Sequence, residues 1–117
     1  NLRDRLKQTQ EVVVPMFNKA VEKGVKWTVG MDSMHGLIGF EIGSLVDWGL
    51  SPMEALVGAT KQSAEVCGMD KVCGTLEKGK YADIISLVGN PLEDIWSIAR
   101  VNFIMKGGER LDHVSCF

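Results

Sequence analysis

A short segment rich in β-branched residues lies between two helical patterns, and this order constrains the fold more than any other feature. Residues 25–31 read Val-Lys-Trp-Thr-Val-Gly-Met, which is typical of a strand. The polar loop of residues 32–36, Asp-Ser-Met-His-Gly, follows directly. Strands that alternate with helices build α/β proteins. The sequence therefore predicts an α/β fold with Asp32 at the end of the strand.

Helical patterns flank this strand on both sides. Residues 3–23 carry apolar side chains at spacings of three and four, and Gly24 follows as a stop signal. Pro15 lies inside this pattern, so the helix either starts at Pro15 or is kinked there. After the loop, residues 40–48 form a second helical pattern, which Gly49 ends.

A third helix has the strongest local start signals in the chain. Ser51 can cap the helix, Pro52 suits the first helical position, and Glu54 follows three residues after the cap. The apolar pattern continues to Gly68. We therefore expect a helix that starts after Ser51 and ends at Gly68.

The pattern changes after Gly68. Residues 74–80 are rich in turn formers, and residues 83–88 have the pattern of a buried strand. Residues 92–99 indicate a short helix or turn, residues 101–106 another strand, and residues 107–108 a tight turn. An α/β unit is thus followed by a piece of sheet.

Charge and composition exclude several classes of function. The 13 basic and 15 acidic residues give a net charge of −2 and form no run of one sign, so neither nucleic acid nor a membrane surface is an expected partner. No apolar stretch is long enough for a membrane span, and the first ten residues are too polar for a secretory signal. Because the chain starts with Asn1, it suggests a fragment or a processed chain.

The cysteines fit a cytoplasmic protein. Cys67, Cys73 and Cys116 are odd in number, and their spacings match no zinc or redox motif. Reduced thiols in the cytoplasm are therefore expected.

Five segments in order resemble the amidohydrolase superfamily. The last barrel strand of that family is written Gly-Val, apolar residues, then Gly-Thr-Asp, and residues 23–33 resemble it. Residues 74–84, Gly-Thr-Leu-Glu-Lys-Gly-Lys-Tyr-Ala-Asp-Ile, closely resemble its Gly-x-Ile/Leu-x-x-Gly-Lys-x-Ala-Asp signature. The other matching segments are residues 48–56, residues 59–64, and residues 90–95 with 101–108. Each segment is weak alone, but together they cover nearly all of residues 20–110.

The resemblance implies a specific fold. It is the C-terminal part of a (β/α)8 metallo-hydrolase barrel, joined to strands of its small β-sandwich domain. Residues 1–70 would hold the last barrel strand with its flanking helices, and residues 71–117 the C-terminal strands of the small β-rich domain. The His35-Gly36 pair and residues 91–95, Pro-Leu-Glu-Asp-Ile, resemble the branch of imidazolonepropionase-like enzymes and Xaa-Pro dipeptidases.

The resemblance also implies a role for Asp32. Asp32 occupies the position of the family's catalytic aspartate, which binds a divalent metal, with zinc expected, and shuttles a proton to the leaving nitrogen. Met31 stands where the family has threonine, which removes a hydroxyl beside the metal. Ser33 and His35 lie in the loop where such barrels contact a small amide or dipeptide substrate. The plainer alternatives are a capping aspartate in a turn and two solvated loop side chains.

Other conspicuous residues have structural interpretations. Lys80 and Asp83 are expected to position strands, with Asp83 bonded to backbone, and Glu41 and Glu54 to serve as helix-surface and capping residues. His113 is expected to be inert. The tryptophans are expected to pack in the core, and they are Trp27, Trp48 and Trp96.

Two hypotheses remain open. The chain is part of a hydrolase of carbon–nitrogen bonds in amides, cyclic amides or dipeptides, active only with the missing N-terminal barrel or a partner chain. The family's His-x-His, bridging Lys or Glu and later histidines are absent, since only His35 and His113 occur. Alternatively, the chain is a non-catalytic truncated fragment or an oligomerising α/β module, because one strand cannot close a barrel and one carboxylate cannot hold a catalytic metal. An open sheet edge would favour an oligomer.

Overall fold

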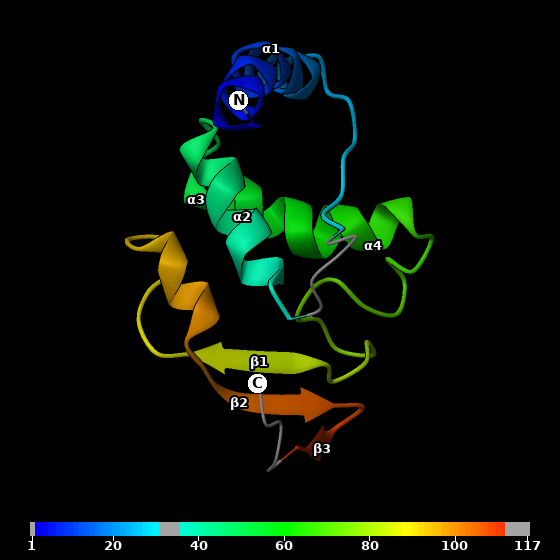
Figure 1. Cartoon of the computed structure of the whole chain (residues 1–117). Coiled ribbons are helices and arrows are strands. Elements are labelled where there is room, and N and C mark those ends of the chain that lie inside the picture. Colours follow the sequence, from blue (N-terminus) through cyan, green and yellow to red (C-terminus); the bar gives the residue numbers. More distant parts are fainter. Residues whose placement is uncertain (1, 31–35, 112–117) are drawn as a thin grey trace.

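Helices occupy the first part of the chain and a small sheet the last part, as Figure 1 shows. The computed structural model describes residues 2–30 and 36–111. The elements in chain order are α1 (Leu2–Glu22), α2 (Ile38–Asp47), α3 (Pro52–Val57), the π-helical turn η1 (Gly58–Gln62), α4 (Ser63–Val66), β1 (Ile84–Leu87), the 3₁₀ helix η2 (Ile95–Ala99), β2 (Val101–Lys106) and β3 (Glu109–Arg110). Mixed helices and strands agree with the expected α/β class.

The first helix continues through Pro15, so it does not begin there. Its end matches the stop signal of Gly24, which has a φ of 73°. The Gly24 N–H donates to the Val21 carbonyl at 2.9 Å, and the Val25 N–H donates to the Ala20 carbonyl at 3.0 Å. These two bonds satisfy carbonyls that the helix end would otherwise leave free, as in a Schellman motif.

The third helix starts as the sequence predicts. The Ser51 hydroxyl accepts from the Glu54 N–H at 3.2 Å, and the Glu54 carboxylate accepts from the Ser51 N–H at 2.8 Å, which is a reciprocal capping box. The helical segments α3, η1 and α4 then follow one another without a break up to Val66. The π-helical geometry of η1 was not predicted.

The three strands form one antiparallel sheet in the order β1-β2-β3. Ile84 lies opposite Met105, and the register shifts between Ser86 and Leu87. Gly107 and Gly108 connect β2 to β3 with φ values of 59° and 87°. Positive φ at both central residues is the geometry of a type I′ turn, which glycine adopts without strain. The predicted strand of residues 101–106 and the tight turn after it are confirmed.

Asp83 fixes the start of β1 against this turn. Its carboxylate accepts the Gly107 N–H at 2.7 Å and also pairs with the Lys106 ammonium. These bonds confirm the predicted structural role of Asp83. The hydrogen bond from Lys106, followed by the bond from the Gly107 backbone, lowers the pKa of Asp83 below its ordinary value of 3.8.

The ion pair of Asp83 should make the hairpin sensitive to acid. A carboxylate with a lowered folded-state pKa stabilises the folded state above its unfolded pKa, and this contribution disappears as pH falls through the folded pKa. Asp83→Asn should therefore speed hydrogen exchange at the Gly107 amide near neutral pH, and the difference from wild type should vanish in strong acid. The exposed Glu22→Gln is the control. A difference that persists in strong acid would contradict the assignment.

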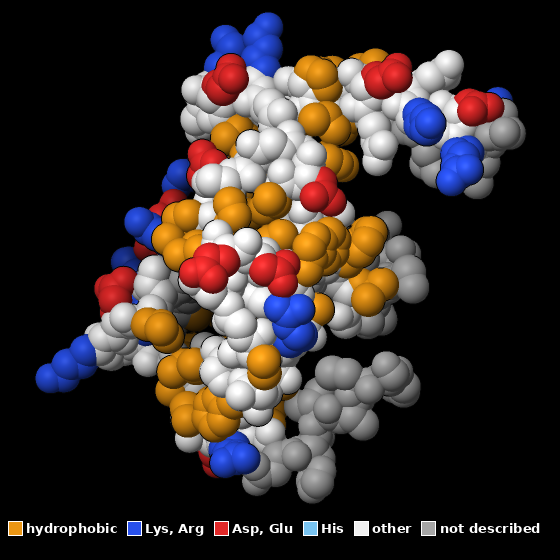
Figure 2. Space-filling view, turned by 90° about the vertical axis from the view of Figure 1, so that its left-hand side faces the viewer, with side chains coloured by type: hydrophobic (Ala, Val, Ile, Leu, Met, Phe, Trp, Pro, Cys, Tyr) orange, Lys and Arg blue, Asp and Glu red, His pale blue; other side chains and the backbone are white. Residues whose placement is uncertain are grey.

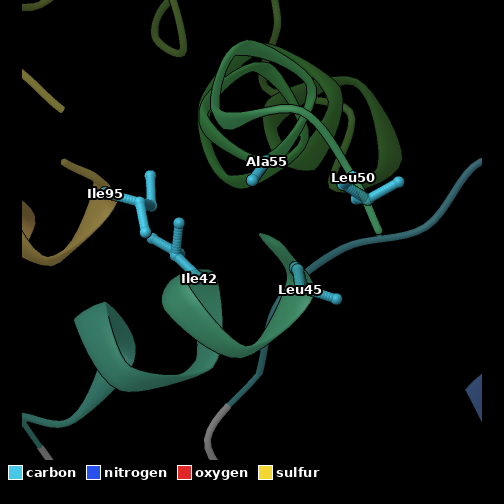
Figure 3. Close-up of a cluster of buried hydrophobic side chains, with 5 residues drawn as sticks. All are labelled: Ile42, Leu45, Leu50, Ala55 and Ile95. Atoms are coloured by element: carbon cyan, nitrogen blue, oxygen red, sulfur yellow. The ribbon is translucent and has the colours of Figure 1, made fainter. Parts of the chain in front are cut away.

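The buried core joins the helices to η2. Figure 3 shows its five side chains, which are Ile42, Leu45, Leu50, Ala55 and Ile95. Ile95 comes from η2, so a segment after residue 70 packs against α2. α2 thus packs against both α3 and η2.

Trp27 and Trp48 pack against the core as expected, whereas Trp96 is 40% exposed, so the core prediction is wrong for Trp96. The Phe17 ring meets the rings of Trp27 and Trp48 edge to face, at centroid distances of 5.6 and 6.0 Å. The Asn18 amide donates to the Trp48 carbonyl at 2.8 Å and so joins α1 to the end of α2. Trp96 packs beside Phe40, with a centroid distance of 5.9 Å.

Part of α1 has no apolar cover. Val12 and Met16 are 59% and 66% exposed. Figure 2 shows further apolar side chains at the surface of one face of the molecule. Among the helices described, none is both long enough and apolar enough to cross a lipid bilayer.

Candidate functional site

The segment that leads to Asp32 is not a strand where the structure describes it. Residues 25–30 form no ladder with any strand in residues 2–30 and 36–111, so the strand prediction for residues 25–31 is wrong over this part. A strand takes its hydrogen bonds from a neighbouring strand. The β-branched residues favour an extended backbone, but a strand also needs a neighbouring strand to pair with, which the local pattern cannot provide.

Side chains of the helix instead hold this segment in place. The Gln62 amide donates to the Trp27 carbonyl at 2.6 Å, and the hydroxyls of Thr28 and Ser63 lie 2.6 Å apart. Lys26 pairs with Glu65 at 2.7 Å. The three side chains that make these contacts lie at the end of η1 and in α4. This part of the helix therefore fixes residues 26–28 by hydrogen bonds and an ion pair.

Trp27 lies directly on η1. A Cβ atom at Gly58 would come within 2.0 Å of the Trp27 ring, so only glycine fits beneath the ring. The Ser63 hydroxyl donates to the Gly58 carbonyl at 2.7 Å, in addition to the Ser63 backbone N–H that the same carbonyl accepts. π-helical turns are frequent at functional sites. In this protein, η1 accommodates the tryptophan that precedes the candidate site.

The end of the segment is bound by Glu41. The Gly30 N–H donates to both carboxylate oxygens of Glu41, at 3.0 and 3.1 Å. Glu41 lies partly exposed in the first turn of α2, and its bond to Gly30 adds a contact that the expected role of a helix-surface residue does not include. One side chain thus connects the residue before the candidate loop to the helix after it.

The predicted site residues Asp32, Ser33 and His35 lie outside the described residues, as does Met31. Their roles as catalytic, metal-binding and substrate-binding residues stay predictions. The structure describes both flanks of their loop. Gly30 is bound to α2 through Glu41, and Gly36 resumes the chain with a φ of 91° shortly before α2 begins.

The described residues do not fit a metal ion by themselves. No group of three or more histidine, cysteine, aspartate or glutamate side chains comes together within residues 2–30 and 36–111. Cys67 and Cys73 are free thiols. Because a tightly bound catalytic metal takes about three protein ligands, any metal centre would need ligands from outside this part of the chain.

Lys80 has the structural role that the sequence predicts. Its ammonium donates to the Thr75 hydroxyl at 2.5 Å and lies 3.4 Å from the Glu77 carboxylate. The Thr75 hydroxyl first and the Lys80 charge second lower the pKa of Glu77 below its ordinary value. The cluster therefore closes the turn before β1.

An open groove of about 830 Å³ lies between the helix η1–α4 and the start of β1. Its lining is mostly apolar and includes Ala64, Met69, Tyr81 and Ile84. None of residues 25–30 or 36–41 lines this groove.

Comparison with known proteins decides the family. The Amidohydrolase family matches residues 7–111, which is most of the chain. The chain belongs to the amidohydrolase family. The resemblance seen in the sequence motifs is thereby confirmed, and members of this family are metal-dependent. No curated protein sequence gives a significant match.

Several solved structures of prolidases are similar to this chain. A Xaa-Pro dipeptidase with methionine bound in its active site is 35% identical with a TM-score of 0.79, and the match covers 86% of this chain and 26% of that one. A candidate prolidase from Bifidobacterium longum is 34% identical with a TM-score of 0.76, covering 81% and 25%. A prolidase in complex with N-methylphosphonate-L-proline is 31% identical with a TM-score of 0.70, covering 87% and 26%. The chain thus spans about a quarter of the length of these relatives.

Proposed function

We propose that this amidohydrolase chain contributes Asp32 to the active site of a metal-dependent hydrolase of amide or dipeptide carbon–nitrogen bonds. The observation that carries the proposal is the family match over residues 7–111, which spans position 32. The similarity to a Xaa-Pro dipeptidase supports dipeptides that end in proline as the substrate class. The ligand N-methylphosphonate-L-proline, bound to another similar prolidase, supports the same class.

In the proposed mechanism, Asp32 accepts a proton and returns it to the leaving nitrogen. A divalent metal, with zinc expected, would supply an activated water when bound. A carboxylate that holds the proton between attack and bond cleavage acts as general base and then as general acid. Ser33 and His35 would contact the substrate beside it. The described residues contain no cluster of three or more side chains that could bind the metal, so none of them takes part in a step on the metal.

The proposal includes an assignment of the fold. Residues 1–70 would carry the last strand of a (β/α)8 barrel with its flanking helices, and residues 71–117 the C-terminal strands of a small β-rich domain. The remaining metal ligands would come from an N-terminal part of the barrel or from a partner chain. The coverage of about a quarter of each similar prolidase supports this division of the site.

The second candidate is a non-catalytic module that assembles with another chain or with copies of itself. The exposure of Val12 and Met16 on α1 favours it, because apolar side chains on an amphipathic helix are usually covered. The two candidates differ in a direct assay, since only the first gives substrate turnover.

We use "full chain" for these residues together with the N-terminal barrel part or partner chain that supplies the other metal ligands. The full chain should hydrolyse a Xaa-Pro dipeptide such as Met-Pro when zinc is supplied. Turnover should stop when the zinc is removed with a chelator and return when zinc is restored. Free proline released per unit time is the measurement, and Met-Ala is the control for the choice of the second residue. A zinc-loaded chain that cleaves no dipeptide and no simple amide would contradict the proposed function and favour the non-catalytic module.

A further inference from the structure

We propose that Cys67 and Cys73 form a redox site, in which the two thiols join in a reversible disulfide bond. The residues that carry this proposal, 60–79, are all described by the structure, and the proposed role of Asp32 does not enter it. Both cysteines are free thiols that line the groove between the helix η1–α4 and the start of β1. Cys67 is exposed and Cys73 is half-buried. Two thiols in one groove can react with each other where the backbone brings them together.

Cys67 extends the helical face to which Ala64 belongs. The Cys67 N–H donates to the Ser63 carbonyl at 3.0 Å, and the φ of Cys67, −81°, lies in the right-handed helical region. Cys67 follows Ala64 by three residues, which places both side chains on the same side of α4, about one turn apart. A segment that reaches Ala64 from the end of the helix therefore passes Cys67.

Gly74 packs on this face at Ala64. A Cβ atom at Gly74 would lie 2.5 Å from the Ala64 Cβ and 3.1 Å from the Thr60 carbonyl oxygen, so only glycine allows the approach. The φ of Gly74 is 92°, a conformation that glycine adopts without strain. A contact this close fixes where the chain just before Gly74 must lie.

The turn before Gly74 starts beyond the end of the helix. The Met69 N–H donates to the Ala64 carbonyl at 2.8 Å, and the Cys73 N–H donates to the Met69 carbonyl at 3.0 Å. The chain thus passes the helix end, turns, and returns to Ala64 at Gly74. The Cα atom of Cys73 lies about 3.8 Å from that of Gly74, on the side from which the chain returns. That side is the last turn of the helix, where Cys67 lies.

The bond forms by exchange with a small disulfide such as oxidised glutathione, which accepts two electrons. The thiolate of one cysteine attacks that disulfide and releases one glutathione thiolate. The thiolate of the other cysteine then attacks the protein–glutathione disulfide, forms the bond between Cys67 and Cys73, and releases the second glutathione thiolate. The two protons of the cysteine thiols pass to the two released thiolates. The bond ties the end of α4 to the turn before β1, across the proposed division between residues 1–70 and 71–117.

The test is a peptide map of the full chain, incubated in glutathione buffers with a rising oxidised fraction and then alkylated. Trypsin cuts after Lys71, between the two cysteines, so the bond should join the peptides of residues 62–71 and 72–78. The joined pair should weigh two hydrogen atoms less than the two reduced peptides, and dithiothreitol should separate it. Unreacted thiols, glutathione adducts alone, or a bond from either cysteine to another one such as Cys116 would overturn the proposal.

Two glycine variants test the geometry. Gly74 and Gly79 have φ values of 92° and 93°, so alanine meets the same backbone strain at both positions. Only Gly74→Ala also places a Cβ atom against Ala64, whereas Gly79 has no neighbouring atom within 4 Å. Gly74→Ala should move Cys73 away from Cys67 and lower the equilibrium constant for disulfide formation by about 10-fold or more. Gly79→Ala should change that constant by less than about twofold. Equal constants in the two variants would overturn the proposed geometry, and if Gly74→Ala does not fold, the wild-type peptide map decides alone.

Discussion

Asp32→Asn is expected to lower kcat of the full chain by roughly 10²–10⁴-fold, the range that general acid–base catalysis contributes. Asparagine has nearly the shape of aspartate, so the loop should keep its conformation. Its amide cannot accept the proton that the mechanism assigns to the carboxylate, and it is a weaker ligand for a divalent cation. Steady-state turnover of a Xaa-Pro dipeptide measures the loss, and metal content measured on the same sample separates the two causes.

The control for this substitution is Asp70→Asn, at an exposed aspartate in the turn after α4. It makes the same change in charge and should leave kcat within about twofold of wild type, as surface substitutions usually have small effects. Wild-type turnover in Asp32→Asn would refute the catalytic assignment whatever the metal content. If Asp32→Asn loses both its metal and its turnover, this result would support Asp32 as a metal ligand.

Elements with local causes were predicted well from the sequence. Ser51 and Glu54 form their capping box within four residues, so the pattern of the sequence contains the whole interaction. Gly24 ends α1 for a similarly local reason, because its positive φ completes the helix cap. The turn at Gly107 and Gly108 is equally local. Each of these features depends on neighbours in the chain and needs no tertiary contact.

Features with distant causes were not predicted. The segment of residues 25–30 has strand-like residues, but a strand exists only when a neighbouring strand pairs with it. The contact of Trp27 with Gly58 joins residues far apart in the sequence, and no local pattern indicates it. Glu41 showed only the signal of an acidic residue near a helix start, which is favourable for any helix. Its bond to Gly30 depends on how α2 packs.

The candidate site was found by resemblance, because a single aspartate after an apolar segment carries little information alone. The motifs around Asp32 identified the family, and the match over residues 7–111 confirms that family. The role of Asp32 itself stays a prediction, since residues 31–35 lie outside the part of the chain that the structure describes. The structure adds the anchors on one side of the loop, which no motif contains.

Gly58→Ala should destabilise the protein, although alanine favours a helix over glycine by about 1 kcal/mol. Gly58 has ordinary helical angles, with φ −59° and ψ −46°, so alanine meets no backbone strain there. Its Cβ atom would lie 2.0 Å from Cη2 of Trp27, and the Trp27 ring is also in contact with Phe17. Overpacking costs about 1–3 kcal/mol, and this contact calls for the upper end of that range. Thermal and denaturant unfolding of the full chain measure the net loss.

A double-mutant cycle with Trp27→Leu isolates the cause. Leucine removes the ring that occupies the space above Gly58, so Gly58→Ala in this background should become neutral or stabilising through helix propensity alone. Gly79→Ala is the control, because its φ of 93° gives strain without any neighbouring atom within 4 Å. Gly79→Ala should lower the free energy of unfolding by the same amount in the wild-type background and in the Trp27→Leu background. Equal destabilisation by Gly58→Ala in both backgrounds would mean that the Trp27 ring does not contact Gly58. The segment before Asp32 would then be held in place by Gln62, Ser63 and Glu41 without the Trp27 contact.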